Sequence, residues 1–219
     1  MANNLANVST TAFKRDGVSF SDALEQEMRS GSTGQSLGTL GVGTTDGKEY
    51  TVFEPGPTQI TGRPLDMSIT SQEGMFAVQT PQGTRYTRDG AFVLNDQRQL
   101  VTTDGYPVLD DRQQPITIPE GTLGVNEAGE ISVDGSSVGT LGIYKGAYIK
   151  EGGNLYSTPN ATPLDGATIR PQSLEGSNVN PVEAMVQMIQ VGRNFDLSQK
   201  TIQQQDDLSQ RLIQSLSTR

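Results

Sequence analysis

The segment Glu175-Gly176-Ser177-Asn178-Val179-Asn180-Pro181-Val182-Glu183-Ala184-Met185-Val186 marks a change from strand-and-turn composition to helix-forming composition. Beyond Asn180 the chain has a single glycine, Gly192. Pro181 suits the first helical turn, where its missing N–H costs nothing, and Asn180 is a good N-cap before it. The pattern predicts one long helix from Pro181 to the end of the chain.

The apolar residues of this predicted helix are separated by threes and fours, as on the seam of a coiled coil. Gln199, Asp206 and Ser209 interrupt that seam. A helix with so broken a stripe is weak alone, so we expect packing against partners to order it. The seam positions are Met185, Ile189, Gly192, Phe195, Ile202, Ile213 and Leu216.

The other end of the chain, Ala2-Asn3-Asn4-Leu5-Ala6-Asn7-Val8-Ser9-Thr10, is also helix-forming and rich in asparagine. Asn3, Asn4 and Asn7 are three to four residues apart, so their amides can share one helix face. We expect this helix to end near Thr10. A second short helix is expected over residues 22–29, capped by Ser21, before a Gly-, Ser- and Thr-rich loop over residues 31–50.

Between the two ends, short strand-like runs alternate with turn signals. The turns include the pairs Asp89-Gly90, Asp104-Gly105 and Asp134-Gly135, which suit type I′ hairpins because both residues tolerate positive φ. Six or more short strands at this spacing favour an antiparallel sandwich or an irregular barrel. Strands are expected over residues 65–70, 75–79, 84–87, 91–94, 99–102, 107–109, 116–118, 130–133, 139–144, 154–157 and 168–173.

The fold class predicted from these patterns is mainly β with helical termini. An irregular antiparallel β sandwich or barrel is inserted between N- and C-terminal helices that pair. The expected divisions are a helical segment over residues 1–30, the loop over 31–50, a β domain over 51–175, and the C-terminal helical segment over 176–219. Two helices packed together in an ordinary monomer remain an alternative for the ends.

Composition argues against several functions. The net charge of the 219 residues is −9, and no basic patch suggests nucleic-acid binding. Histidine and cysteine are absent, which removes the commonest general base, the commonest metal ligand and any thiolate site. No run approaches 18 apolar residues, so insertion in a lipid bilayer is not expected.

The sequence also contains no motif for catalysis or for cofactor binding. The acidic pairs Asp110-Asp111 and Asp206-Asp207 are adjacent in sequence, whereas glycoside hydrolysis needs two carboxylates roughly 5–10 Å apart across a cleft. The Asp-Gly segments lack the ligand spacing of a calcium loop. The sequence therefore predicts no enzyme activity, no cofactor and no metal site. A monomeric β domain that binds cell-wall glycan remains an alternative.

Several motifs together resemble the axial proteins of the bacterial flagellum, the rod and hook family. They are Ala2-Asn3-Asn4-Leu5-Ala6-Asn7 followed by Thr11-Ala12-Phe13-Lys14, the stretches 58–66, 86–92 and 99–109, and the segment 175–186. The family usually has glycine where this chain has Ala12, so the turn before Phe13 is expected to differ slightly. Family members usually carry about 20 more residues before the first motif, which suggests that this chain is trimmed there.

The resemblance implies a structural subunit of the flagellar rod, polymerised into a hollow drive shaft that transmits torque to the hook. It is most similar to the proximal rod component, and a distal rod or hook-type subunit is the alternative. It implies a location in the basal body, outside the cytoplasmic membrane. Its partners would be other copies, neighbouring rod and hook proteins, and the flagellar export apparatus, which uses no cleaved signal.

Under this resemblance the terminal segments are the assembly surface. The expected assembly residues are Asn3, Asn4, Leu5, Asn7, Phe13, Asn178, Val182, Met185, Ile189, Phe195 and Ile202.

Overall fold

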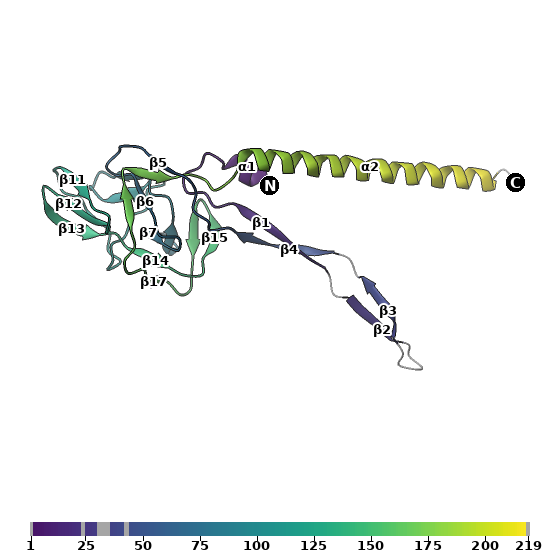
Figure 1. Cartoon of the computed structure of the whole chain (residues 1–219), viewed down its shortest axis with the longest axis horizontal. Coiled ribbons are helices and arrows are strands. Elements are labelled where there is room, and N and C mark those ends of the chain that lie inside the picture. The colour runs from purple at the N-terminus through teal and green to yellow at the C-terminus, as the bar shows by residue number, and fades with distance from the viewer. Residues whose placement is uncertain (1, 23–24, 30–35, 42–43, 218–219) are drawn as a thin grey trace. The chain divides into compact units, whose positions relative to one another are not determined.

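The computed structural model describes residues 2–22, 25–29, 36–41 and 44–217, and the burial of residues 2–17, 49–211, 213 and 214. The chain divides into two compact units (Figure 1). The smaller unit joins the two ends, Met1–Val8 and Val179–Arg219, and the larger unit is Ser9–Asn178. The predicted pattern of a β domain between helical ends is therefore confirmed in outline.

The smaller unit is helical. It contains α1 (Ala2–Ala6) and α2 (Pro181–Ser217), which contact each other as predicted. The carboxamide oxygen of Asn180 accepts hydrogen bonds from the backbone N–H groups of Val182 at 3.1 Å and Glu183 at 3.3 Å. Asn180 is thus the N-cap that the sequence predicted.

The larger unit is built from antiparallel pairs, and its largest sheet has six strands in the order β15-β16-β8-β7-β14-β17. Here β7 pairs with β8 through a tight hairpin, with Thr80 opposite Gly83. The described strands form no closed barrel. The members of this sheet are β7 (Met75–Thr80), β8 (Gly83–Thr87), β14 (Ile143–Lys145), β15 (Ile149–Gly152), β16 (Leu155–Ser157) and β17 (Thr162–Pro163).

Smaller antiparallel sheets complete the unit. One has three strands: β11 (Leu123–Val125), β12 (Glu130–Val133) and β13 (Ser136–Thr140). The two-stranded pairs are β9 (Phe92–Leu94) with β10 (Leu100–Thr102), β6 (Met67–Ile69) with β18 (Ile169–Pro171), β5 (Thr58–Ile60) with β19 (Ser173–Glu175), β1 (Asp16–Asp22) with β4 (Thr44–Thr51), and β2 (Glu25–Arg29) with β3 (Ser36–Gly41).

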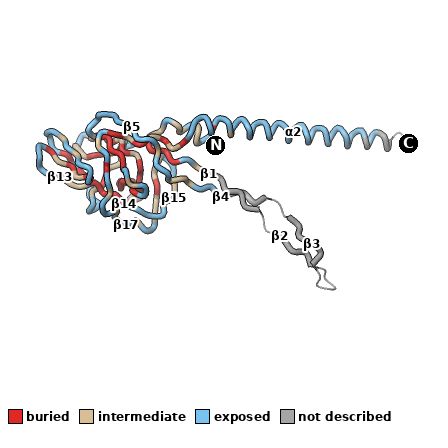
Figure 2. The backbone as a smooth tube through the Cα atoms, in the orientation of Figure 1, coloured by how far each residue is buried: buried red, intermediate tan, exposed pale blue. Residues whose placement is uncertain are grey.

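The core of the larger unit lies on both faces of β7. Successive side chains of a strand point to opposite faces, and here both faces are covered. Phe76 and Val78 belong to one buried cluster, whereas Met75 and Ala77 belong to a second, tyrosine-rich cluster. Figure 2 shows the buried positions gathered in this unit, while α2 is exposed along nearly all of its described length.

Only one of the three Asp-Gly pairs forms the type I′ turn that the sequence predicted. Asp134 and Gly135 have φ of 49° and 80° between β12 and β13, which fits the predicted type I′ turn. At the second pair only Gly105 has a positive φ, 87°, so that hairpin is of another type. Gly90 has no positive φ: it is glycine because a Cβ there would lie 1.7 Å from the carbonyl oxygen of Met67.

The prediction of a helix over residues 22–29 was wrong. Residues 25–29 form β2, which pairs with β3, and Asp22 is the last residue of β1. Residues 23 and 24 of the predicted helix lie outside the described residues. The expected loop over residues 31–50 likewise contains β3 and most of β4 among its described residues. The local helix signal here was weak, a possible cap at Ser21 before a short segment, and antiparallel pairing with β3, the next strand along the chain, overrode it.

The first helix is also shorter than predicted. α1 ends at Ala6, and turns follow over residues 7–9. Among the helices that the structure describes, none combines the length and the apolar character that a membrane span requires.

Candidate functional site

The first and last segments of the larger unit meet through their backbones. The N–H of Ala12 donates to the carbonyl of Glu175 at 2.8 Å, and the N–H of Asn178 donates to the carbonyl of Phe13 at 3.2 Å. The two points where the chain enters and leaves this unit are therefore tied together within it.

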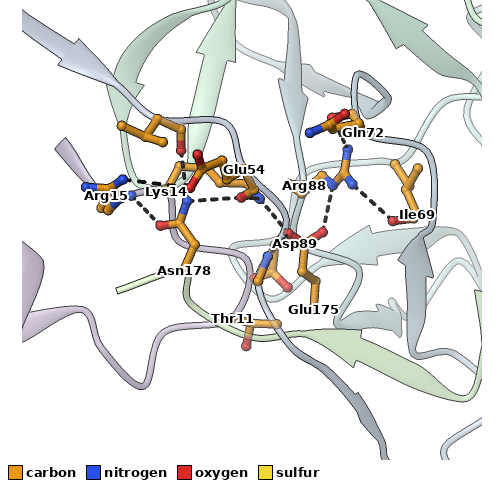
Figure 3. A network of polar contacts seen from close by, with 12 residues as sticks. Thr11, Lys14, Arg15, Glu54, Ile69, Gln72, Arg88, Asp89, Glu175 and Asn178 are labelled. Atoms are coloured by element: carbon orange, nitrogen blue, oxygen red, sulfur yellow. Dashed lines mark hydrogen bonds and ion pairs between the residues drawn. The ribbon is translucent and has the colours of Figure 1, made fainter. Parts of the chain in front are cut away.

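A buried charge cluster lies at the same place (Figure 3). We call Lys14, Arg88 and Glu175 the Glu175 cluster; each side chain is at most 3% exposed. One carboxylate oxygen of Glu175 accepts from the ammonium of Lys14 at 2.5 Å and from the N–H of Gly56 at 2.9 Å. The other oxygen accepts from Nε of Arg88 at 2.7 Å.

The two cations have further acceptors, which buried charges require. Lys14 also donates to the carbonyl of Glu54 at 2.8 Å. The guanidinium of Arg88 reaches three carbonyl oxygens, those of Ile69 at 3.0 Å, Gln72 at 3.2 Å and Gly74 at 2.5 Å. The cluster thus joins both ends of the unit to β8 and to the turn after β6.

The electrostatics of the cluster favour the ionised carboxylate. Burial alone would raise the pKa of Glu175, but the charges of Arg88 and Lys14 and the hydrogen bonds they donate outweigh it. The pKa of Glu175 is therefore held below its ordinary value. Because a lone buried carboxylate would be costly, the cluster acts as one unit.

Asn178 and Phe13, two of the predicted assembly residues, lie within the larger unit. The carboxamide of Asn178 accepts from the N–H of Arg15 at 2.7 Å and donates to the carbonyls of Val52 at 2.9 Å and Glu54 at 3.0 Å. These contacts join segments that are distant in sequence, so the structure gives Asn178 an internal role.

Phe13 is 4% exposed, and its ring lies 4.1 Å from the ammonium of Lys150. That ammonium also contacts both carboxylate oxygens of Asp16 at 2.9 Å. Phe13 is therefore packed inside the unit beside a cation, rather than presented on its surface.

Ala12 adopts a φ of 54°, the left-handed conformation in which glycine is favoured, and its side chain is fully buried. This is the position where the resemblance suggested a glycine. The turn before Phe13 therefore requires a small residue at position 12.

The remaining predicted assembly residues of the C-terminal segment lie on α2, and their side chains are more than half exposed. Those exposed fractions are 68% for Val182, 51% for Met185, 56% for Ile189, 62% for Phe195 and 59% for Ile202. Ile213 of the same seam is 66% exposed. The sequence predicted a helix with such a seam, and the helix is confirmed.

The predicted residues of the N-terminal segment lie on or beside α1. The side-chain amide of Asn7 donates to the carbonyl of Asn3 at 2.9 Å and to its side-chain oxygen at 3.1 Å. Of the three asparagines predicted to share a face, Asn3 and Asn7 are therefore side by side, although Asn7 follows the end of α1. Asn3 is exposed, and Asn4 and Leu5 are half-buried.

Sequence reasoning missed the Glu175 cluster, although each of its members lies in or beside a motif that carried the resemblance. Lys14 and Glu175 were in the two terminal motifs, and Arg88 was in the stretch 86–92. The sequence shows only that three charged residues lie in these motifs; that they are buried and meet is visible only in the fold. Among the described side chains, no group of three acidic residues is placed to hold a metal ion.

Two family models match the chain. Residues 170–215 match the model described as "Flagellar basal body rod FlgEFG protein C-terminal". Residues 71–135 match the model described as "Flagellar hook protein FlgE/F/G D1 domain". The first match covers most of α2, and the second covers the middle of the β unit.

Known proteins are similar over nearly the whole chain. The flagellar basal-body rod protein FlgG of Bacillus subtilis (strain 168) is 33% identical over 97% of this chain and 90% of its own length. The rod proteins FlgF of Mesorhizobium japonicum and of Caulobacter vibrioides are each 32% identical, over 100% and 99% of this chain and 91% and 90% of their own lengths. With identity of this extent to several rod proteins, the chain belongs to the flagellar basal-body rod protein family.

Proposed function

We propose that α1 and the exposed seam of α2 are the surface through which this chain packs into a hollow rod that transmits torque to the hook. As a member of its family, the chain is a structural subunit of the flagellar basal body and assembles with other rod and hook subunits. The proposal concerns which residues make the contacts and what the assembly does.

The exposure of α2 is the observation that carries the proposal. α2 has 37 residues, so it is about 55 Å long. A seam residue such as Ile189 or Phe195 is more than half exposed, although each would gain about 1.5–3 kcal/mol from full burial. Polar residues alone would suffice for a helix that remained in water, so the repeated apolar positions favour burial against neighbouring subunits.

The contact between α1 and α2 supports a joint role for the two ends. α1 has only five residues, which is too short for a stable isolated helix, and it carries small and amide side chains. Small residues let helices approach closely, and amides can fix their register through hydrogen bonds. Repetition of one such head-to-tail contact gives a helical filament or tube where its rotation does not close into a ring, as a rod requires.

We further propose that the chain is not an enzyme and that it reaches the basal body through the flagellar export apparatus without a cleaved signal. The lack of histidine and cysteine supports the first statement. The second rests on the family alone. The expectation that the chain makes no insertion into lipid rests on the sequence, in which no run approaches 18 apolar residues. The assignment to the proximal segment of the rod stays a prediction, because FlgG and FlgF relatives match at nearly equal identity.

The test is Ile189→Asp in the full chain, expressed in a strain that lacks the native protein. Because Ile189 is 56% exposed, the change should leave the melting temperature of the purified chain within about 2 °C. In a packed helix interface, an unpaired charge costs several kcal/mol in every subunit. The variant should therefore fold but fail to form rods that support swimming.

Gln190→Asp is the matched control, because it adds the same charge at the next residue of α2, outside the seam. Swimming should persist in that strain. Normal swimming and normal rods with Ile189→Asp would show that the seam is not an assembly surface.

A further inference from the structure

The larger unit presents one apolar side chain that stands out from its surface. Ile60, at the end of β5, is 83% exposed, the highest value for a large apolar residue among the described side chains. Its backbone is firmly placed, because Ile60 pairs with Ser173 in β19. The N–H groups of the next two residues, Thr61 and Gly62, both donate to the carbonyl of Gln172, at 2.8 and 3.2 Å. Ile60 is thus a fixed apolar knob.

The same unit contains a cleft of about 820 Å³ that could receive such a knob. Phe53, Met75 and Tyr148 supply apolar lining. The wall is well ordered by packing: the hydroxyl of Tyr148 donates to the carbonyl of Tyr144 at 2.7 Å, and the ring of Phe53 lies 6.2 Å from that of Tyr148, between centroids. An isoleucine side chain fits easily in this volume.

The knob and the cleft are on different parts of the unit. β5 lies along one edge, and β14 and β17, which carry lining residues Lys145 and Thr162, lie at the opposite edge (Figure 1). A copy therefore does not fill its own cleft with its own Ile60. A knob and a cleft at separate places are what a head-to-tail contact between identical copies needs. Such a contact propagates into a filament where its rotation does not close into a ring.

Charges near the two features are also complementary. The cleft is lined by Glu54 and Glu73 together with Lys145, so its lining carries one net negative charge. On the knob side, Arg170 is exposed, two residues from the Gln172 carbonyl that holds the loop after Ile60. Opposite charge around an apolar contact favours one orientation of the partner.

We propose that Ile60 of one copy inserts into the cleft lined by Phe53, Met75 and Tyr148 of the next copy, so that the β units also contact each other in the rod. This inference rests on the proposed function, since it names a second contact in the same assembly. The partner is another copy of this chain.

Cysteine cross-linking tests the contact directly, because the chain has no cysteine of its own. We would introduce Ile60→Cys together with Ala147→Cys, which also lines the cleft, and oxidise isolated rods. A ladder of covalent dimers, trimers and longer products is expected from the double variant, and monomers only from each single variant. Assembled rods that give no ladder would overturn the proposal.

A charge placed on the knob gives an independent measurement. Ile60→Asp should reduce the number of rods per cell at least about tenfold, since burying an unpaired carboxylate is strongly unfavourable. Gln59→Asp is the control: it adds the same charge at the exposed residue before Ile60 on β5, whose side chain points to the other face of the strand, and should leave rod number unchanged. Both purified variants should melt as the native chain does, which separates assembly from folding.

Three outcomes would count against the inference. Normal rod number with Ile60→Asp overturns it, while failure of Ile189→Asp to assemble still supports the proposed function. An equal loss with Gln59→Asp overturns it too, because the effect would then be that of any added charge. Binding of cell-wall glycan fragments to the purified chain, lost with Tyr148→Ala, would reassign the cleft to a sugar ligand.

Discussion

The ammonium of Lys14 lies 2.5 Å from the carboxylate of Glu175, although 161 residues separate them in sequence. Both side chains are almost fully buried. This pair closes the larger unit where the chain enters and leaves it, so it fixes the two segments that continue into α1 and α2. The stability of the β unit and the placement of its ends therefore depend on the same contact.

Glu175→Gln should destabilise the larger unit by about 3–5 kcal/mol, because it leaves the charges of Lys14 and Arg88 buried without an anion. Urea unfolding of the full chain, followed by tyrosine fluorescence, measures this. Glu54→Gln is the control: its carboxylate is 68% exposed and 3.7 Å from Arg15, so the loss should stay below about 0.5 kcal/mol. If Glu175→Gln and Glu54→Gln both lowered the free energy of unfolding by the same small amount, the cluster would not be important for stability.

The stability of the chain should fall as the pH rises from about 4 to 6, because of Asp89. Burial is the main cause that raises the pKa of Asp89 from 3.8 to about 6, and nearby Asp104 and Asp66 add to it. A carboxyl whose pKa is higher in the folded than in the unfolded protein stabilises the fold fully below pH 3.8, and that contribution is lost as the pH rises through 6.

Asp89→Asn should remove this decline, because the amide is neutral throughout and its oxygen can still accept from the N–H of Ala91, now at 3.0 Å. Melting temperatures between pH 4 and 8 report the difference. At pH 7 the variant should be more stable than the native chain. A native profile as flat as that of Asp89→Asn would refute the assignment.

The contribution of Glu175 to stability should change with pH in the opposite direction to that of Asp89, because the pKa of Glu175 is held below its ordinary value. Its contribution is present above the unfolded pKa, near 4.5, and is lost as the pH falls through the lower folded value. Acid unfolding of the native chain should therefore steepen below about pH 4.5. Glu175→Gln should show a weaker acid dependence in that range.

Ala12→Val should be strongly destabilising, by roughly 2 kcal/mol or more, whereas Ala12→Gly should be close to neutral. A β-branched residue is severely strained at the φ of 54° found here, and its extra methyl groups have no room at a fully buried site. Glycine removes the strain but also loses one buried methyl group and gains unfolded-state entropy, so its effects nearly cancel. Equilibrium unfolding of both variants checks the contrast; equal stability of the two would contradict it.

Tyr156→Phe should leave stability unchanged or raise it by up to about 1 kcal/mol. Its hydroxyl is buried, and among the described groups it finds no hydrogen-bond partner, so its removal relieves a desolvation cost. Tyr148→Phe is the matched comparison, because that hydroxyl donates to the Tyr144 carbonyl at 2.7 Å, and the change should cost about 1 kcal/mol. The prediction fails if Tyr156→Phe is the more damaging variant.

The sequence by itself determined the features whose causes are local. The N-cap at Asn180, the type I′ turn at Asp134-Gly135 and the long helix after Pro181 each depend on residues a few positions apart, and each was predicted. The same holds for most strand positions, since alternating apolar residues between turns are a local pattern. Motif resemblance added the family, which the comparisons confirmed.

Only the tertiary structure decided the features that depend on partners outside the local stretch of sequence. Residues 25–29 have a plausible helix pattern, but hydrogen bonds to β3 make them a strand. Gly90 is required by the carbonyl of Met67, and Phe13 is buried beside Lys150. The Glu175 cluster brings residues 14, 88 and 175 together, and the cost of burying each charge is offset only where all three meet. No window of sequence contains such a balance, because it exists only after the chain has folded.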